Sequence, residues 1–177
     1  DNSVFPGPDK KEHLLLEVKH ISSKSLFKDI SFELYAGEII GITGLLGSGR
    51  SELAKALFGM VPIYEGELYI EGKKTELKGV QDAIKNGIAC VPEDRLTEGL
   101  FMPHSIGKNV MLSSYRKMID QYGFISQKKI DEEVTKWIDE LKIVTPSGEL
   151  PVQALSGGNQ QKVVIAKWIE TEPKILI

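Results

Sequence analysis

The chain has 177 residues, 41% of them hydrophobic and 27% charged, which is typical of about one soluble globular domain and excludes a disordered or fibrous chain. The 22 Lys and Arg residues against 25 Asp and Glu leave a net charge of −3, so the sequence offers no basic surface for general nucleic-acid binding. The one cysteine, Cys90, cannot form an internal disulfide or a zinc cluster, which favours a reducing compartment such as the cytoplasm.

The first half of the chain predicts a linker followed by strands. Residues 1–12 combine prolines and a glycine with polar residues, which favours an extended linker, and a domain is expected over 13–177. Short β-rich segments broken by Ser and Gly predict strands at 14–21, 27–34 and 38–43. The third segment is the most apolar, so we expect a buried strand that leads into a helix.

A helix is predicted over 50–58, where apolar residues gather on one face and Gly59 follows as a stop. Alternation then predicts a strand over 66–72, a short helix follows over 80–86, and 88–91 reads as a buried strand that ends at proline.

The second half is predicted to be mostly helical. Ser126 is expected to cap a helix whose apolar residues recur at three- and four-residue spacings, including Trp137. A further helix follows residues 155–158, is nearly all apolar over 163–169, and gives way to a final strand at 175–177.

The segment GLLGSGRS at residues 44–51 matches the P-loop pattern, with arginine where lysine is usual. Glycines permit positive φ angles, so the backbone N–H groups can turn inward at the positive end of the following helix, where a phosphate chain fits. The cationic side chain is expected to meet the β- and γ-phosphates, and the Ser51 hydroxyl to bind Mg²⁺. Because a forked guanidinium differs from a compact ammonium, we expect binding to survive better than hydrolysis. The predicted ATP-binding residues are Gly44, Gly47, Ser48, Gly49, Arg50, Ser51 and Glu52.

A second segment, LSGGNQQK, occupies residues 155–162, and its Ser156 lies 105 residues after Ser51 of the P-loop. The two segments together resemble the ATP-binding subunits of ABC transporters. The alternative is that Ser156 only caps a helix, a role expected in either case. The resemblance implies an α/β P-loop NTPase fold with an antiparallel β subdomain and a helical subdomain at about 104–165. It also implies that this signature segment contacts ATP held by a partner domain. The residues it assigns to that contact are Leu155, Ser156, Gly157, Gly158 and Gln160.

Three segments together are similar to the C-terminal nucleotide-binding half of bacterial importers for ribose, galactose or xylose: the P-loop, Val91–Arg95 and the signature ending in Asn-Gln-Gln. Where the general family has a glutamine that touches Mg²⁺ and the attacking water, this chain has Glu93. A carboxylate remains a hard oxygen ligand for Mg²⁺; the alternative is a surface charge paired with Arg95. The adenine-stacking aromatic has no clear match, because Phe27 belongs to an apolar pattern and is expected in the core.

The resemblance implies an ATPase with ATP and Mg²⁺ that drives monosaccharide uptake from the inner face of the cell membrane. The implied partners are a second nucleotide-binding domain, membrane permease subunits and, indirectly, a periplasmic or extracellular sugar-binding protein. The family pattern continues beyond Ile177 with an acidic Mg²⁺ ligand and a general base, so no catalytic base is assigned within the chain and the 177 residues alone are expected not to hydrolyse ATP. The alternatives are a regulatory half that binds ATP without hydrolysing it, and a soluble ABC protein outside transport.

Overall fold

The computed structural model describes residues 13–119, 123 and 125–177, so the predicted linker over 1–12 lies outside the described residues. The chain divides into two compact units, Asp1–Ile88 and Ala89–Ile177, which are described separately.

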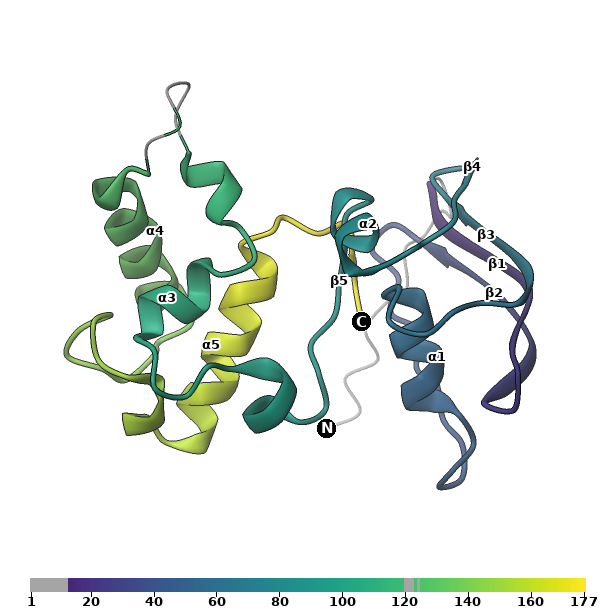
Figure 1. The fold of residues 1–177 in the computed structure, drawn as a ribbon, viewed down its shortest axis with the longest axis horizontal. Helices are drawn as coiled ribbons and strands as arrows, with labels where there is room; N and C mark the ends of the chain where they lie inside the picture. Colours follow the sequence, from purple (N-terminus) through teal and green to yellow (C-terminus); the bar gives the residue numbers. More distant parts are fainter. Residues whose placement is uncertain (1–12, 120–122, 124) are drawn as a thin grey trace. The chain divides into compact units, whose positions relative to one another are not determined.

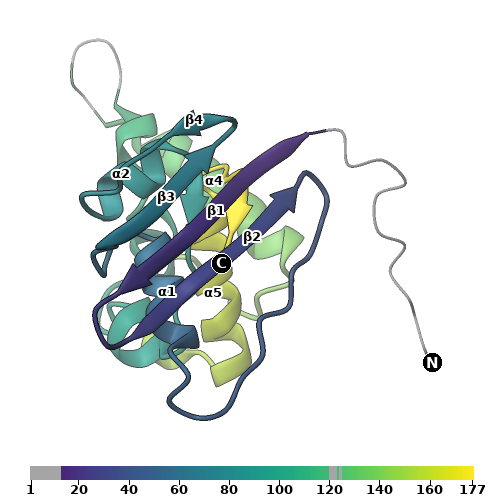
Figure 2. The same cartoon turned by 90° about the vertical axis from the view of Figure 1, so that its right-hand side faces the viewer.

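The first unit contains a four-stranded antiparallel sheet in the order β2-β1-β3-β4 (Figure 2). In β1, Leu16 and Val18 are buried whereas Lys19 is exposed, so the alternation of the sequence becomes one apolar and one polar face. The strands predicted over 14–21, 27–34 and 66–72 are confirmed, and a short fourth strand is added. The strands are β1 (Leu14–Ser23), β2 (Phe27–Tyr35), β3 (Glu65–Ile70) and β4 (Lys73–Lys74).

Helix α1 (Arg50–Leu57) buries Leu53, Ala56 and Leu57 and contacts β2 (Figure 1). Burial of an apolar face against a sheet stabilises a helix that is too short to form alone. Helix α2 (Val80–Lys85) follows and buries Ala83. Both helices were predicted, and Phe27 is a core residue as expected, with 7% of its surface exposed.

The prediction of a buried strand over 38–43 is wrong in this structure. These residues have no regular structure, and Ile39 and Ile42 are 85% and 48% exposed. An interior strand needs neighbours on both sides for its N–H and C=O groups. Among the described residues, no strand pairs with this segment. Apolar sequence alone therefore did not suffice to form the strand.

The second unit is mainly helical, and α3 packs against both α4 and α5 (Figure 1). The helix predicted after Ser126 is confirmed, including its cap: the Ser126 hydroxyl accepts a hydrogen bond from the Lys129 amide. The α-helices are α3 (Ile106–Met111), α4 (Gln127–Glu140) and α5 (Gly157–Ile169). A π-helical turn η1 (Arg95–Gly99) and the 3₁₀ turns η2 (Tyr115–Met118) and η3 (Val152–Ala154) complete the helical elements.

Two short strands, β5 (Ile88–Ala89) and β6 (Ile175–Leu176), pair with each other. The Ile177 amide donates to the Ala89 carbonyl at 2.9 Å, and the Val91 amide donates to the Ile177 carbonyl at 2.8 Å. Both strands are shorter than the predicted 88–91 and 175–177.

The core of the second unit lies between the helices. Trp137 and Trp168 are 7% and 8% exposed, which confirms both as core residues. The indole N–H of Trp137 donates to a carboxylate oxygen of Glu170 at 2.6 Å, so a buried polar pair joins α4 to the end of α5. The apolar residues that share this core include Ile106, Val110, Met111, Ile130, Val134, Val163 and Val164.

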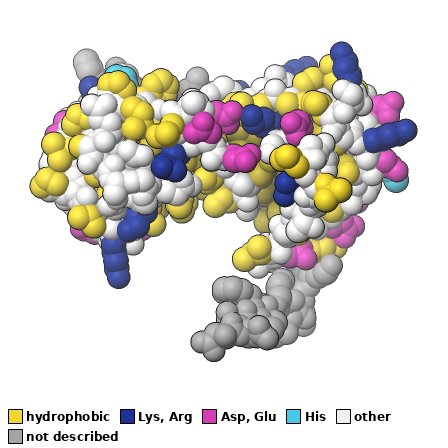
Figure 3. Space-filling model, turned by 90° about the horizontal axis from the view of Figure 1, so that it is seen from below, with side chains coloured by type: hydrophobic (Ala, Val, Ile, Leu, Met, Phe, Trp, Pro, Cys, Tyr) yellow, Lys and Arg dark blue, Asp and Glu magenta, His cyan; other side chains and the backbone are white. Residues whose placement is uncertain are grey.

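Among the described residues, no helix has the length and apolar character needed to cross a bilayer. Acidic and basic side chains are both visible on the face drawn in Figure 3, as expected from the small net charge.

Candidate functional site

The predicted P-loop is a turn that closes on itself before α1. The Ser48 amide donates to the Leu45 carbonyl at 3.1 Å, and Gly47 and Gly49 have φ angles of +78° and +84°. A Cβ on Gly44 would stand 2.5 Å from the Ser48 hydroxyl oxygen, and one on Gly49 would overlap the carbonyl oxygen of Leu26. The loop therefore requires glycine both for backbone conformation and for space.

Helix α1 begins without a side-chain cap, because its N-cap is Gly49 in the left-handed conformation. The first-turn amides of a helix that is not capped by a side chain are suited to bind an anion, and the helix dipole favours negative charge there. This end of α1 is held in place by burial of Leu53 one turn further on.

The side chain of Arg50 approaches the beginning of the P-loop. Its Cδ lies 3.6 Å from the position that a Cβ on Gly44 would occupy, and the residue is exposed. The Arg50 side chain therefore passes close to Gly44, the first glycine of the loop. Ser51 is exposed and Glu52 is half-buried in the first helical turn.

Glu93 lies in the second unit, after β5, and is exposed. Its neighbour Asp94 caps the π-helical turn η1 by accepting hydrogen bonds from the Leu96 amide and the Thr97 hydroxyl, each at 2.8 Å. The Thr97 hydroxyl and the Leu96 amide hold the pKa of the Asp94 carboxyl below its usual value. The turn that follows Glu93 is therefore fixed by its own side chains.

The signature segment ends at the N-terminus of α5, where Ser156, Gly157 and Gly158 are exposed. The expectation that Ser156 caps the helix is wrong: Ser156 holds the N-cap position but makes no side-chain cap bond. Its hydroxyl instead accepts from the Asn159 side-chain amide at 3.0 Å, and the Asn159 carbonyl oxygen accepts from the Val144 amide at 3.0 Å. The Asn159 side chain, which was not among the predicted site residues, therefore takes the place of a first-turn backbone amide as the donor to the Ser156 hydroxyl.

Two other helices of the second unit also have a serine at the N-cap position. Ser105 and Ser126 each accept a hydrogen bond from the amide three residues later, at 3.2 and 3.4 Å. Within the described part of the chain, Ser156 is the serine N-cap that leaves this role unfilled. The first-turn amides of α5, like those of α1, are thus not capped by a side chain and are suited to hold an anion.

Gln160 is turned inward rather than toward the exposed glycines. It is 7% exposed, its side-chain amide donates to the Leu155 carbonyl at 3.1 Å and to the Val152 carbonyl at 3.4 Å, and its oxygen accepts from Arg95. The structure gives Gln160 contacts that support the backbone of the signature segment.

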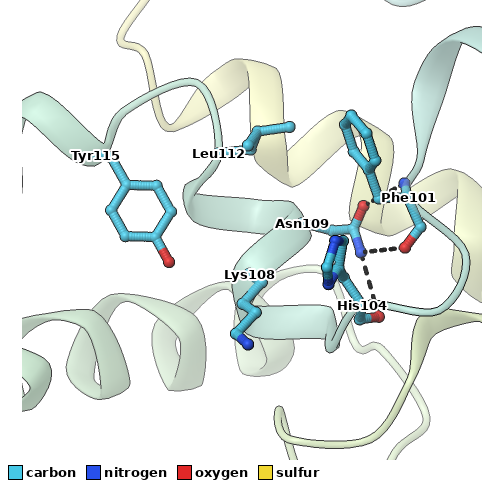
Figure 4. Close-up of a pocket in the computed structure, with 6 residues that line it drawn as sticks. All are labelled: Phe101, His104, Lys108, Asn109, Leu112 and Tyr115. Carbon is cyan, nitrogen blue, oxygen red and sulfur yellow. Dashed lines mark hydrogen bonds between the residues drawn. The ribbon is translucent and has the colours of Figure 1, made fainter.

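A pocket in the second unit is lined by residues of α3 and the segments on either side of it (Figure 4). Phe101 and Leu112 are 56% and 44% exposed there, and the rings of Phe101 and His104 lie 5.9 Å apart. The lining residues are Phe101, His104, Lys108, Asn109, Leu112 and Tyr115.

Comparison with known proteins gives consistent matches. The profile of the ABC transporter family matches residues 27–177. A ribose import ATP-binding protein of Clostridium tetani is 45% identical over 168 residues, which cover 95% of this chain and 33% of that protein. A galactose/methyl galactoside import ATP-binding protein of Fusobacterium nucleatum is 41% identical over 177 residues, which cover 98% of this chain and 35% of that protein.

The chain spans about a third of the length of these relatives. Among solved structures, the ADP conformation of MJ1267, an ATP-binding cassette of an ABC transporter, superposes with a TM-score of 0.74 at 20% identity, covering 92% of this chain and 67% of that one. This likeness shows the fold, and it agrees with the expected P-loop NTPase architecture.

Proposed function

This chain belongs to the ABC transporter family, and on that premise we propose that it forms part of an ATP-binding subunit that drives import of a monosaccharide. The relatives named for ribose and galactose import support this substrate class. The observation that carries the proposal is the closed glycine loop at the uncapped start of α1, with the Cδ of Arg50 close to Gly44.

The P-loop residues fit a triphosphate. In this proposal the amides of the loop and of the first turn of α1 bind the phosphate oxygens, and the Arg50 guanidinium binds the β- and γ-phosphates. The Ser51 hydroxyl is the proposed Mg²⁺ ligand in the first unit, and Glu93 is a second candidate ligand. The metal, when bound, neutralises charge on the β- and γ-phosphates. In that role Glu93 would contribute favourably only beside the metal, because a carboxylate alone repels the γ-phosphate.

Ser156, Gly157 and Gly158 are proposed to bind the terminal phosphate of ATP held by a second nucleotide-binding domain. The support is the exposure of these residues and the first-turn amides that Ser156 does not cap. Gln160 supports the same segment from inside. Leu155, which is assigned to the same contact, accepts a hydrogen bond from Gln160 through its carbonyl.

The pocket beside α3 is the proposed contact for the membrane permease. It presents exposed Phe101 and Leu112 next to Lys108, an apolar surface with a polar edge. The sugar-binding protein would act through the permease, and the subunit would then work at the inner face of the cell membrane.

Nucleotide binding can be tested on the intact protein with a fluorescent ATP analogue. We expect Arg50→Ala to weaken binding, and Ser51→Ala to reduce the Mg²⁺ dependence of binding. Lys28→Ala is the matched control, because Lys28 is an exposed cation on β2 outside the loop. Equal affinity in all four proteins would contradict the proposal.

The expectation that the 177 residues alone do not turn over ATP stays a prediction. Water attack on the γ-phosphate needs a positioned proton acceptor, and neither the P-loop nor the signature segment is assigned one. A phosphate-release assay that gave Mg²⁺-dependent turnover above a Ser51→Ala control would contradict it.

A further inference from the structure

Arg95 lies two residues after Glu93 and reaches the N-terminus of α5. Its terminal nitrogen Nη2 stands 2.9 Å from the position of a Cβ on Gly157, and its Nε donates to the side-chain oxygen of Gln160 at 3.4 Å. Any side chain at residue 157 would displace this guanidinium. Glycine at residue 157 therefore leaves room for the Arg95 guanidinium.

The contact fixes which way the Gln160 amide faces. An amide has one accepting and one donating end, and the Arg95 donor selects the oxygen for its side. The nitrogen of Gln160 then faces the carbonyls of Leu155 and Val152, to which it donates. Because Gln160 is buried, a rotated amide would set oxygen against oxygen with no water to relieve it.

The other end of the same segment is also fastened to α5. The ammonium of Lys167 donates to the Gly99 carbonyl, and a Cβ on Gly99 would stand 3.1 Å from a methyl group of Val164. Residues 157 and 167 are about 15 Å apart along a helix. The turn Arg95–Gly99 is thus held against α5 at two separated points.

A simple stabilising role explains the position of Arg95 poorly. The N-terminus of a helix carries partial positive charge, so a cation there is disfavoured unless other contacts hold it. A neutral donor would satisfy Gln160 equally well at the level of hydrogen bonding.

We propose that Arg95 is a positioning residue for the signature segment Leu155–Gly158, that it acts through Gln160, and that it joins this segment to the turn that follows Glu93. The inference rests on the proposed function and deepens it. A displacement at Glu93 is then carried to the residues that meet the partner's ATP, without a direct contact between Arg95 and the nucleotide.

The test compares ATP hydrolysis and amide exchange in the intact protein. For Arg95→Ala we expect kcat to fall between about tenfold and a hundredfold while KM for ATP stays within about twofold, since only placement is lost. Amide hydrogen exchange over residues 156–160 should become about tenfold faster, with exchange over α4 unchanged. Arg95→Gln keeps a neutral donor but on a shorter side chain, so it should fall between the wild type and Arg95→Ala. Lys129→Ala, which removes an exposed cation from α4, is the control and should match the wild type.

The double variant Arg95→Ala/Gln160→Ala tests whether Arg95 acts through Gln160. It should lose no more kcat than the more damaging single variant, because both changes break one chain of contacts. Losses that multiply would overturn the proposal, as would unchanged kcat in Arg95→Ala. If the wild type does not hydrolyse ATP, the proposed function is refuted instead. The role of Arg95 is then tested by amide exchange alone, and unchanged exchange over residues 156–160 in Arg95→Ala would overturn it.

Discussion

The side-chain amide of Asn109 forms hydrogen bonds with both the backbone amide and the backbone carbonyl of Phe101. The Asn109 oxygen accepts from the Phe101 amide at 2.8 Å, and its nitrogen donates to the Phe101 carbonyl at 3.1 Å (Figure 4). The same nitrogen also donates to the Ser105 carbonyl at 3.0 Å. Asn109 is 1% exposed, so one buried residue of α3 holds the loop that forms the edge of the pocket. We infer that the shape of the proposed permease contact depends on it.

Asn109→Leu should therefore lower the free energy of unfolding by about 2–4 kcal/mol, because several buried backbone groups lose their partner. Amide exchange over residues 101–105 should rise more than exchange over α4. Urea unfolding and exchange measurements check both. Lys108→Leu, at the exposed neighbouring position, is the control; equal losses in the two variants would contradict the inference.

The P-loop prediction concerns Gly49. Alanine in the left-handed conformation costs about 1–2 kcal/mol, and its Cβ would also meet the Leu26 carbonyl, so the turn must shift. We expect Gly49→Ala to lose ATP binding by at least about tenfold while circular dichroism stays close to the wild type.

Gly72→Ala separates strain from crowding. Gly72 has a φ of +75° but open space around it, so this variant carries the backbone penalty without the clash. It should bind a fluorescent ATP analogue as the wild type does. Equal loss of binding in the two variants would mean that strain alone accounts for the effect.

Sequence patterns predicted well wherever local information decides the structure. The alternation of apolar and polar residues predicted the bounds of β1 to within two residues. The cap by Ser126 and the buried apolar face of α4 were also confirmed. The two failures have different causes. The apolar segment at 38–43 pairs with no strand among the described residues. The Ser156 hydroxyl bonds to the side chain of Asn159, three residues later, and Asn159 is itself held by the Val144 amide, fifteen residues earlier. The Arg95 contact spans 65 residues, so no local pattern could have indicated it.

Ser156→Arg tests the proposed role of the signature. Ser156 is exposed, so a larger side chain can be accommodated without unfolding the helix, but it would fill the space in front of the first-turn amides. We expect ATP hydrolysis by the intact protein to fall by at least about a hundredfold, as when a transition-state charge loses its donors. Binding to this chain's own P-loop should remain. Gln153→Arg adds the same charge at an exposed residue upstream and should stay active; loss of hydrolysis in both variants would point to a charge effect alone.

Lys167 makes stability depend on pH. It is 4% exposed, and burial lowers the pKa of its ammonium from the ordinary lysine value of 10.5 to about 8. Below about pH 8 both the folded and unfolded states hold the proton, so the penalty for burying the charge is constant. As the pH rises above that value, the folded state releases its proton while the unfolded state retains it, so the folded state becomes more stable. Between about pH 7 and about pH 9.5 this gain amounts to roughly 2 kcal/mol relative to Lys167→Met, which carries no charge at this position. Urea unfolding of both proteins followed by tryptophan fluorescence measures the difference, and other titrating groups cancel in the comparison. Parallel pH profiles for the two proteins would show that the buried ammonium keeps an ordinary pKa.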